Sequence, residues 1–205
     1  MKLVIVTDAW EPQVNGVVRT LGKTRDHLQE MGYDVTMLTP LDFRTIPCPS
    51  YPSIRLALMP YRKLANMLDN LQADAVHIAT EGPLGMAARR WCLRHNIRFT
   101  SSFHTQFPEY LRLRLPIPLS WSYAWLRRFH RPALRTLVPT ISQQQRLQQY
   151  GFQDVYVWGR GVDTKIFTAD NPQNYDLPRP VFINMGRVAV EKNIEAFLDL
   201  DLPGS

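Results

Sequence analysis

Short β-prone runs alternate with helical runs along this chain, and the alternation restricts the fold more than any single motif does. The first run, Leu3 to Val6, is uninterrupted and apolar, as expected of a strand buried on both faces of a sheet. Helical spacing follows from Val17 to Met31, where Gly32 ends it. Further strands are predicted at 35–38, 54–58, 75–78, 99–103, 137–141 and 155–158, with helices between most of them. The pattern predicts βαβ units and an α/β fold with a parallel, doubly wound sheet, whereas the proline-rich stretch 40–52 is expected to lack regular structure.

The pattern restarts near the end of the chain, which indicates a second domain. We predict a first Rossmann-like domain at 1–158 and a polar, proline-containing linker at 159–180. Residues 181–205 then form the start of a second Rossmann-like domain, because Val181 to Met185 resembles a strand and is followed by a Gly186 loop and a helix. One strand-helix unit cannot bury its own faces, so the chain is expected to stop inside this domain.

Positive charge is concentrated in one segment. The net charge is +6, and no acidic residue occurs between Glu109 and Asp154. A helix is predicted from Leu119 to about Pro132. On its surface Arg127, Arg128 and Arg131 share a narrow arc, beside Trp121, Trp125 and Phe129. This arrangement is typical of a helix at a membrane surface, and equally of a core-packing helix with a solvated arginine face.

No signal peptide and no apolar run long enough to cross a bilayer are visible in the sequence. The two cysteines, Cys48 and Cys92, lie far apart without metal-ligand spacing around them. We therefore expect a reduced, cytoplasmic protein without a structural zinc site.

Candidate site residues follow the expected strands 3–6 and 99–103. Gly16 lies in the loop after the first strand, where a glycine before a helix lets backbone N–H groups approach a phosphate. The alternative is that Asn15-Gly16 is only a turn. His104 follows the strand 99–103 at the same sheet edge and can donate a hydrogen bond to a substrate hydroxyl or to developing charge, or it is a structural histidine.

Two further cations follow the first strand of the second domain. Arg187 and Lys192 lie near an expected helix N-terminus, where they can clamp a pyrophosphate, Arg through its planar fork and Lys as a compact charge. The alternative is an ordinary solvated start of a helix.

Five motifs, taken in order, resemble the family 4 retaining glycosyltransferases of the GT-B type, and most resemble the bacterial α-mannosyltransferase and sulfolipid-synthase-like branch. The resemblance covers the whole chain. The motifs are Thr7-Asp8…Pro12…Asn15-Gly16-Val17-Val18, Glu81-Gly82-Pro83-Leu84-Gly85, Ser102-Phe103-His104-Thr105…Phe107-Pro108…Tyr110, Gly161-Val162-Asp163…Phe167 and Gly186-Arg187…Glu191-Lys192-Asn193.

The resemblance implies two Rossmann-like domains facing a cleft, with a nucleotide-sugar donor held mainly by the second and an acceptor mainly by the first. Gly16 would lie against the donor diphosphate and His104 would contact the transferred sugar. Arg187 and Lys192 would neutralise the leaving diphosphate, so that no metal or other cofactor is needed. Asp8, Asn15 and Glu81 would face the cleft or the acceptor.

The expected function is retaining hexosyl transfer to a lipid or other membrane-associated acceptor, on a protein bound peripherally to the inner face of an anionic membrane. The pair of glutamates that holds the donor in this family is missing after Ser205, so the chain alone is expected to be inactive. The alternative is a non-catalytic α/β domain that docks on a membrane surface. Nucleic-acid binding is disfavoured because no recognised motif accompanies the basic segment. A dehydrogenase is disfavoured because the first loop lacks a G-x-G-x-x-G fingerprint.

Overall fold

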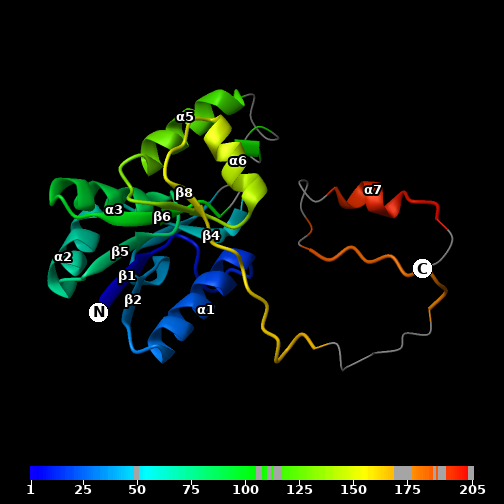
Figure 1. Cartoon of the computed structure of the whole chain (residues 1–205), viewed down its shortest axis with the longest axis horizontal. Helices are drawn as coiled ribbons and strands as arrows, with labels where there is room; N and C mark the ends of the chain where they lie inside the picture. The colour runs from blue at the N-terminus through cyan, green and yellow to red at the C-terminus, as the bar shows by residue number, and fades with distance from the viewer. Residues whose placement is uncertain are drawn as a thin grey trace.

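The computed structural model describes residues 1–48, 51–104, 108–109, 112, 117–168, 177–186, 188 and 193–202. Its centre is a six-stranded parallel sheet in the order β2-β1-β5-β6-β7-β8 (Figure 1). The strands are β1 (Lys2–Val6), β2 (Asp34–Leu38), β5 (Ala75–Ile78), β6 (Phe99–Ser102), β7 (Thr136–Val138) and β8 (Val155–Val157). The predicted α/β fold with a Rossmann-like parallel sheet is confirmed for this part of the chain.

Helices cover both faces of the sheet. They are α1 (Gly16–Glu30), α2 (Tyr61–Leu71), α3 (Pro83–Arg94), α5 (Leu119–His130) and α6 (Ile141–Gln149). In Figure 1, α1 lies below the sheet, and α5 and α6 lie above it. Successive residues of β1 reach opposite layers, because side chains alternate along a strand. Val4 and Val6 pack in the core that contains Leu64 of α2, whereas Ile5 packs with Leu21 of α1.

The order of the strands determines where a ligand can bind. From β1 the chain passes through α1 to β2 on one side, and it later returns to β5 on the other side of β1. The strand order therefore reverses between β1 and β5. In open α/β sheets, ligands bind outside the carboxyl ends of the strands at such a point. The loops after β1 and β5, together with the neighbouring loop after β6, form this edge.

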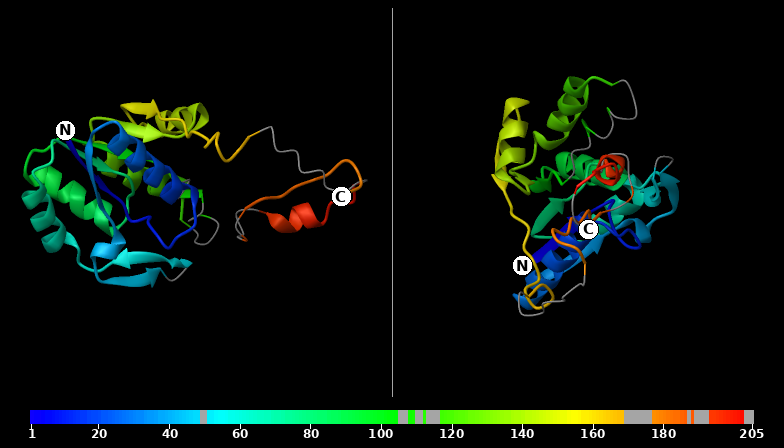
Figure 2. Two further views of the ribbon diagram at one scale, coloured as in Figure 1. Left: turned by 90° about the horizontal axis from the view of Figure 1, so that it is seen from below. Right: turned by 90° about the vertical axis from the view of Figure 1, so that its right-hand side faces the viewer.

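The proline-rich stretch is more regular than its composition indicates. It contains a short 3₁₀ helix, η1 (Pro40–Asp42), and an antiparallel hairpin of β3 (Thr45–Cys48) and β4 (Tyr51–Ala57). Figure 2 shows this hairpin, in cyan, projecting from the sheet. The prediction of no regular structure is wrong. Each strand of a two-stranded ribbon has one free edge, and a proline is tolerated there because no partner needs its N–H. Pro47, which lacks an N–H, can lie on such an edge next to the register shift at Cys48.

The predicted second unit is formed only in part. A short helix, α7 (Ile194–Leu198), is present, and it lies apart from the sheet in Figure 1 and in the left view of Figure 2. Residues 181–185 do not form the expected strand. A strand needs a partner for its backbone N–H and C=O groups, and no second sheet occurs in this region of the described chain. The division at 158 and 180 stays a prediction, consistent with β8 ending at Val157.

Candidate functional site

Asp8 connects the loop after β1 to the N-terminus of α3. Its carboxylate accepts hydrogen bonds from the backbone N–H groups of Leu84 and Gly85, at 2.8 and 3.2 Å, and from Thr80 Oγ1 at 2.8 Å. Asp8 is almost completely buried, and this burial raises the pKa of its carboxyl group. The resemblance implies that Asp8 faces the cleft or the acceptor, which stays a prediction, and in the structure its carboxylate caps α3. Both oxygens are used there to hold the loops after β1 and β5 together.

Asn15 also has a capping role, at the N-terminus of α1. Its Oδ1 accepts hydrogen bonds from the N–H groups of Val17 and Val18, each at 3.0 Å, and its Nδ2 donates to Gln13. Neither Asn15 nor Gly16 has a positive φ, so this dipeptide does not form a left-handed turn. Asn15 is an N-cap in the structure, and its role in the cleft stays a prediction.

Gly16, the first residue of α1, lies next to the end of an arginine side chain. A Cβ atom at this position would lie 2.9 Å from Nη1 of Arg160, a residue that follows β8. The guanidinium of Arg160 therefore covers the first residue of α1. Nη2 of the same side chain donates a long hydrogen bond, 3.4 Å, to the backbone oxygen of His104. Arg160 thus connects the two site residues expected from the sequence, Gly16 and His104.

His104 lies behind this arginine with one ring nitrogen unused. Its Nε2 is buried and has no hydrogen-bond partner among the described residues. Burial, with smaller contributions from His77 and Arg160, lowers the pKa of His104 to about 3, so the ring is neutral at pH 7. A neutral imidazole can offer one N–H donor and one acceptor but no positive charge. The predicted position of His104 at the site edge is confirmed, and its contact with sugar stays a prediction.

A second histidine supports His104 from inside the sheet. His77 of β5 shares hydrogen bonds with Thr100 Oγ1 at 2.8 Å and with Ser102 Oγ at 2.9 Å, one through each ring nitrogen. Burial lowers the pKa of His77 to about 4, so it too is neutral. The ring of Trp158 lies against both histidines, with centroid distances of 6.1 Å to each. His77 and Trp158 therefore form a wall that fixes the end of β6.

Glu81, the third residue expected in the cleft, is held by a buried histidine of α5. His130 Nε2 lies 3.1 Å from Glu81 Oε1, and its Nδ1 lies 2.8 Å from Ser101 Oγ. The Glu81 side chain is 22% exposed, compared with 1% for His130. One face of the carboxylate therefore remains accessible at the sheet edge. The arrangement resembles a Ser-His-Glu triad, but Ser101 is fully buried and no substrate can reach it.

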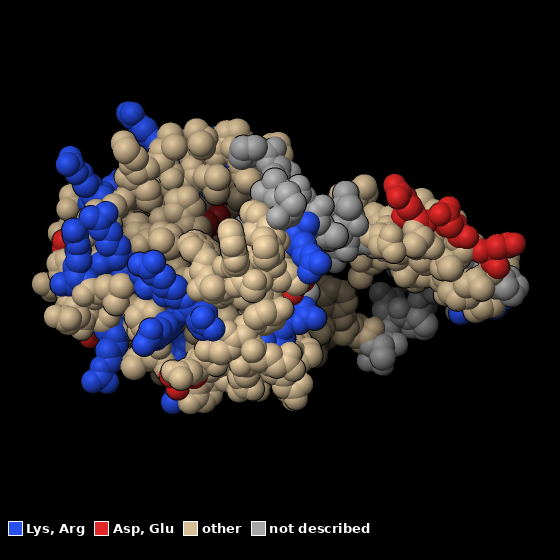
Figure 3. Space-filling model, turned by 90° about the horizontal axis from the view of Figure 1, so that it is seen from above, with Lys and Arg blue, Asp and Glu red and all other residues tan. Residues whose placement is uncertain are grey.

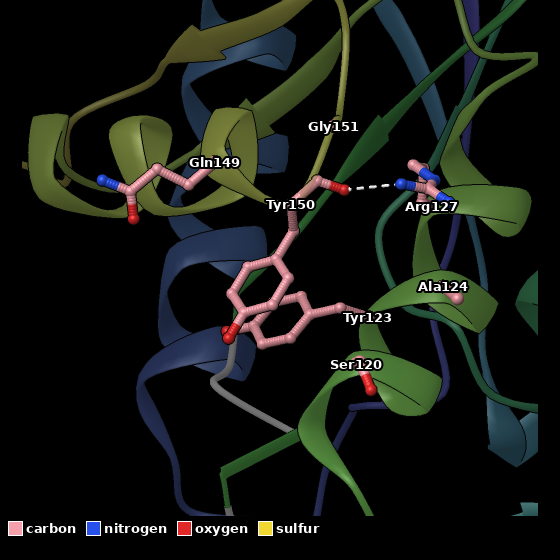
Figure 4. Close-up of a pocket in the computed structure, with 7 residues that line it drawn as sticks. All are labelled: Ser120, Tyr123, Ala124, Arg127, Gln149, Tyr150 and Gly151. Atoms are coloured by element: carbon pink, nitrogen blue, oxygen red, sulfur yellow. Dashed lines mark hydrogen bonds between the residues drawn. The ribbon is translucent and has the colours of Figure 1, made fainter.

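Two pockets formed by described residues lie away from these side chains. One of about 370 Å³ is formed between α5 and α6, where Tyr123 and Tyr150 stack at 3.7 Å and Arg127 Nη1 donates to Tyr150 O at 2.9 Å (Figure 4). The other, about 300 Å³, adjoins it and shares Arg127 and Gly151. Neither is lined by Gly16, Glu81 or His104. Gly16 is exposed, whereas Glu81 and His104 are partly buried.

Helix α5 carries the predicted basic face, and α3 extends it. Arg127, Arg128 and Arg131 are exposed, and Trp121 and Trp125 have exposed fractions of 73% and 46%. Figure 3 shows the Lys and Arg side chains gathered over one part of this face. Phe129, expected in line with the tryptophans, is instead buried. A helix advances 100° per residue, so Phe129 lies about 80° around the helix from Trp121.

The contribution of α3 was not apparent from the sequence, because its arginines lie far from α5 along the chain. Arg89 Nε donates to Phe129 O at 2.8 Å, and its Nη2 donates to Arg128 O at 2.9 Å. These bonds satisfy carbonyls in the last turn of α5 and hold the two helices together. Arg90 and Arg94 lie over the ring of Tyr61, at 4.4 and 5.5 Å. The basic face therefore spans two helices.

Some expectations fall outside what the structure describes or remain without a test. Arg187 and Lys192 lie outside the described residues. Within the described part of the chain, no group of three or more His, Cys, Asp and Glu is placed to hold a metal ion. The same part contains no helix with the length and apolar character needed to span a bilayer.

Four residues near the site were not expected from the sequence: His77, His130, Trp158 and Arg160. Each lies in or near a segment with the sequence pattern of an ordinary strand, loop or helix end.

Together, the edge offers a neutral histidine, a partly exposed glutamate and an exposed arginine at the N-terminus of a helix. A neutral imidazole and a carboxylate are suited to hydroxyl groups, and an arginine at a helix N-terminus is suited to an anion. No group at this edge is placed as a hydrolytic nucleophile among the described residues. The arrangement therefore fits a ligand that is rich in hydroxyls and carries an anionic group.

Curated relatives were compared with the chain. It is 25% identical over 230 residues to the GDP-mannose-dependent alpha-mannosyltransferase of Mycobacterium tuberculosis, covering 100% of this chain and 61% of that protein. It is 26% identical over 204 residues to the sulfoquinovosyl transferase SQD2 of Arabidopsis thaliana, covering 82% and 38%. It is 27% identical over 125 residues to the alpha-monoglucosyldiacylglycerol synthase of Streptococcus pneumoniae, covering 54% and 28%. The chain thus spans at most about three fifths of the length of these relatives.

A solved structure shares the fold. An alpha-glucosyltransferase in complex with UDP and a 13-mer DNA matches with a TM-score of 0.51 and 18% identity, over 80% of this chain and 43% of that one. The model of Glycosyltransferase Family 4 matches residues 14–166, which include Gly16, Glu81, His104 and Arg160. The match covers three quarters of the chain, and the chain therefore belongs to glycosyltransferase family 4.

Proposed function

We propose that the protein to which this chain belongs transfers a hexosyl group from a nucleotide-sugar to an acceptor with retention of configuration. The observation that carries the proposal is that Gly16, Glu81 and His104 follow the neighbouring strands β1, β5 and β6, beside the point where the strand order reverses. Residues with these properties match a ligand that combines hydroxyls with a diphosphate. Family membership supports the reaction class.

In this proposal each residue has a limited role. His104, neutral because it is buried, donates a hydrogen bond to the transferred sugar near the reacting carbon. Gly16 allows the diphosphate to approach the N-terminus of α1. Arg187 and Lys192 neutralise the charge that grows on the leaving diphosphate, and in this role they make a metal unnecessary. The residue roles in the second domain rest on the resemblance alone.

A lipid acceptor is the second part of the proposal. A relative named as an alpha-monoglucosyldiacylglycerol synthase supports it, as does the basic face of α3 and α5 with its exposed tryptophans. The GDP-mannose-dependent relatives favour a mannosyl donor. We propose a peripheral protein at the cytoplasmic face of the membrane, where nucleotide-sugars and the lipid acceptor meet.

The test of this reaction is a transfer assay on the full-length protein with GDP-mannose and UDP-glucose as alternative donors and diacylglycerol-type lipids as acceptors. We expect a glycolipid whose anomeric configuration, determined by NMR, equals that of the donor sugar. The 205-residue chain assayed beside it is expected to give little or no product, because it holds only part of the donor side. An inverted product would contradict the retaining mechanism, and robust turnover by the short chain would contradict the need for the remaining half.

A second candidate function is docking on an anionic membrane without catalysis, favoured by the same basic face. We expect the 205-residue chain to co-sediment with vesicles that contain anionic lipid, and this binding to be lost when Arg127, Arg128 and Arg131 are all changed to Ser. The matched control changes Arg19, Arg44 and Arg98, exposed residues outside α3 and α5, so that the loss of charge is equal. Equal loss of binding in both triple variants would show a general charge effect and no docking face. Vesicle binding together with an inactive full-length protein would favour the non-catalytic alternative.

A further inference from the structure

Arg160 carries the strongest unassigned feature of the structure. It follows β8, and its guanidinium lies over the first residue of α1, with Nη1 2.9 Å from the position that a Cβ atom of Gly16 would occupy. Its Nη2 reaches the backbone oxygen of His104. A single side chain therefore spans the loops after β1 and β6. Its side chain is exposed to solvent, so a ligand can reach it.

The segment that bears Arg160 is held against α1 by an ion pair. Lys23 Nζ of α1 lies 3.1 Å from Asp163 Oδ2. Asp163 also closes a turn, because its backbone oxygen accepts from the N–H groups of Ile166 and Phe167, and its Oδ1 accepts from Lys165 N. The position of Arg160 is therefore set by contacts on the chain after it.

The electrostatic setting of Arg160 is unfavourable without a ligand. The N-terminus of a helix carries a partial positive charge, and a cation placed there is repelled. Among the described residues, no carboxylate lies within ion-pair distance of Arg160. The nearby Asp163 is paired with Lys23 instead. The adjacent His104 leaves a buried Nε2 without a partner in the described chain. An anionic group with oxygen atoms would complement all three features: the cation, the helix N-terminus and the unpaired imidazole nitrogen.

We propose that Arg160 binds a phosphate group of the nucleotide-sugar donor from the side of the first domain, in addition to the proposed phosphate ligands Arg187 and Lys192. The inference rests on the proposed function and adds a donor-binding residue to it. The planar guanidinium can bind two phosphate oxygens at once, which a lysine at the same place cannot do. Arg160 thereby holds the diphosphate over Gly16 while the sugar extends toward His104.

Inorganic pyrophosphate is a suitable probe, because it needs no contact with the nucleotide-binding half. We would titrate the ¹⁵N-labelled 205-residue chain with it at constant ionic strength and follow the amide resonance of Gly16. Arg160→Gln is expected to weaken the binding at least about tenfold. Arg160→Lys should fall between this variant and the unmodified chain. Arg98→Gln is the matched control: Arg98 is exposed and lies just before β6, at the opposite edge of the sheet.

The outcomes separate this inference from the proposed function. If pyrophosphate shifts Gly16 equally in Arg160→Gln and in the unmodified chain, Arg160 is not a phosphate ligand, while the site at Gly16 and the proposed reaction stand. If Arg98→Gln weakens binding as much as Arg160→Gln, the effect is one of net charge and the inference is wrong. If the Gly16 resonance does not move in the unmodified chain, the diphosphate site at α1 fails together with the inference. Equal thermal unfolding of the two glutamine variants excludes a general loss of structure.

Discussion

Replacement of Gly85 by alanine is expected to lower the free energy of unfolding by about 3–5 kcal/mol, enough to leave much of the chain unfolded. A Cβ atom here would lie 1.8 Å from the backbone oxygen of Thr80 and 3.3 Å from Ile78 Cγ2. Backbone atoms of the loop after β5 cannot move aside without moving α3. Gly85 N–H also donates to Asp8, so the same displacement would break the cap that joins the two site loops.

The matched control is Gly22→Ala in the middle of α1. No atom lies within 4 Å of the added Cβ there. Alanine is the better helix former, so this variant is expected to raise the free energy of unfolding by about 1 kcal/mol. Urea denaturation of the 205-residue chain followed by circular dichroism measures both changes. Similar stabilities of the two variants would show that the packing of α3 on the loop after β5 is not as tight as the structure has it.

Replacement of His104 by alanine is expected to lower turnover of the full-length protein about 100-fold while leaving the stability of the chain unchanged or slightly higher. The activity is lost because the proposed donor to the transferred sugar is gone. The stability is kept because His104 Nε2 is buried without a partner among the described residues, and removal of an unpaired buried polar atom relieves a cost.

His77→Ala is the counterpart from the same wall. Both ring nitrogens of His77 are hydrogen-bonded, so its removal leaves Thr100 and Ser102 without partners and opens a cavity. We expect a loss of about 3 kcal/mol in the free energy of unfolding. Thermal unfolding of both variants and turnover of the His104 variant are the measurements. A His104→Ala protein as unstable as the His77 variant would assign His104 a structural role, and the proposed sugar contact would lose its support.

The sheet was predictable from the sequence because its strands are coded locally. Leu3 to Val6 is apolar, Ala75 to Ile78 is apolar except for His77, and each run appears as a strand next to a helical pattern. The hairpin β3-β4 was not predictable from its prolines, because pairing with a neighbour decides whether an edge tolerates them. Residues 181–185 show the reverse case, a strand-like run that has no partner to pair with.

The location of the site was predictable, but the contacts that build it were not. Gly16 and His104 follow strands, and strand ends meet at one edge in a parallel sheet. The capping roles of Asp8 and Asn15, in contrast, depend on which backbone N–H groups the tertiary fold presents to them. Arg160 is 144 residues away from Gly16 in the numbering, and nothing local to either residue indicates that they meet.

The carboxyl end of β6 is held by hydrogen bonds on both faces of the sheet. Ser101 bonds to His130 in the layer of α5, and the next residue, Ser102, bonds to His77 in the opposite layer. His104 comes two residues later, so contacts in both outer layers of the domain fix its position. A change in the layer of α5 or around His77 that shifts β6 is therefore expected to move His104 as well.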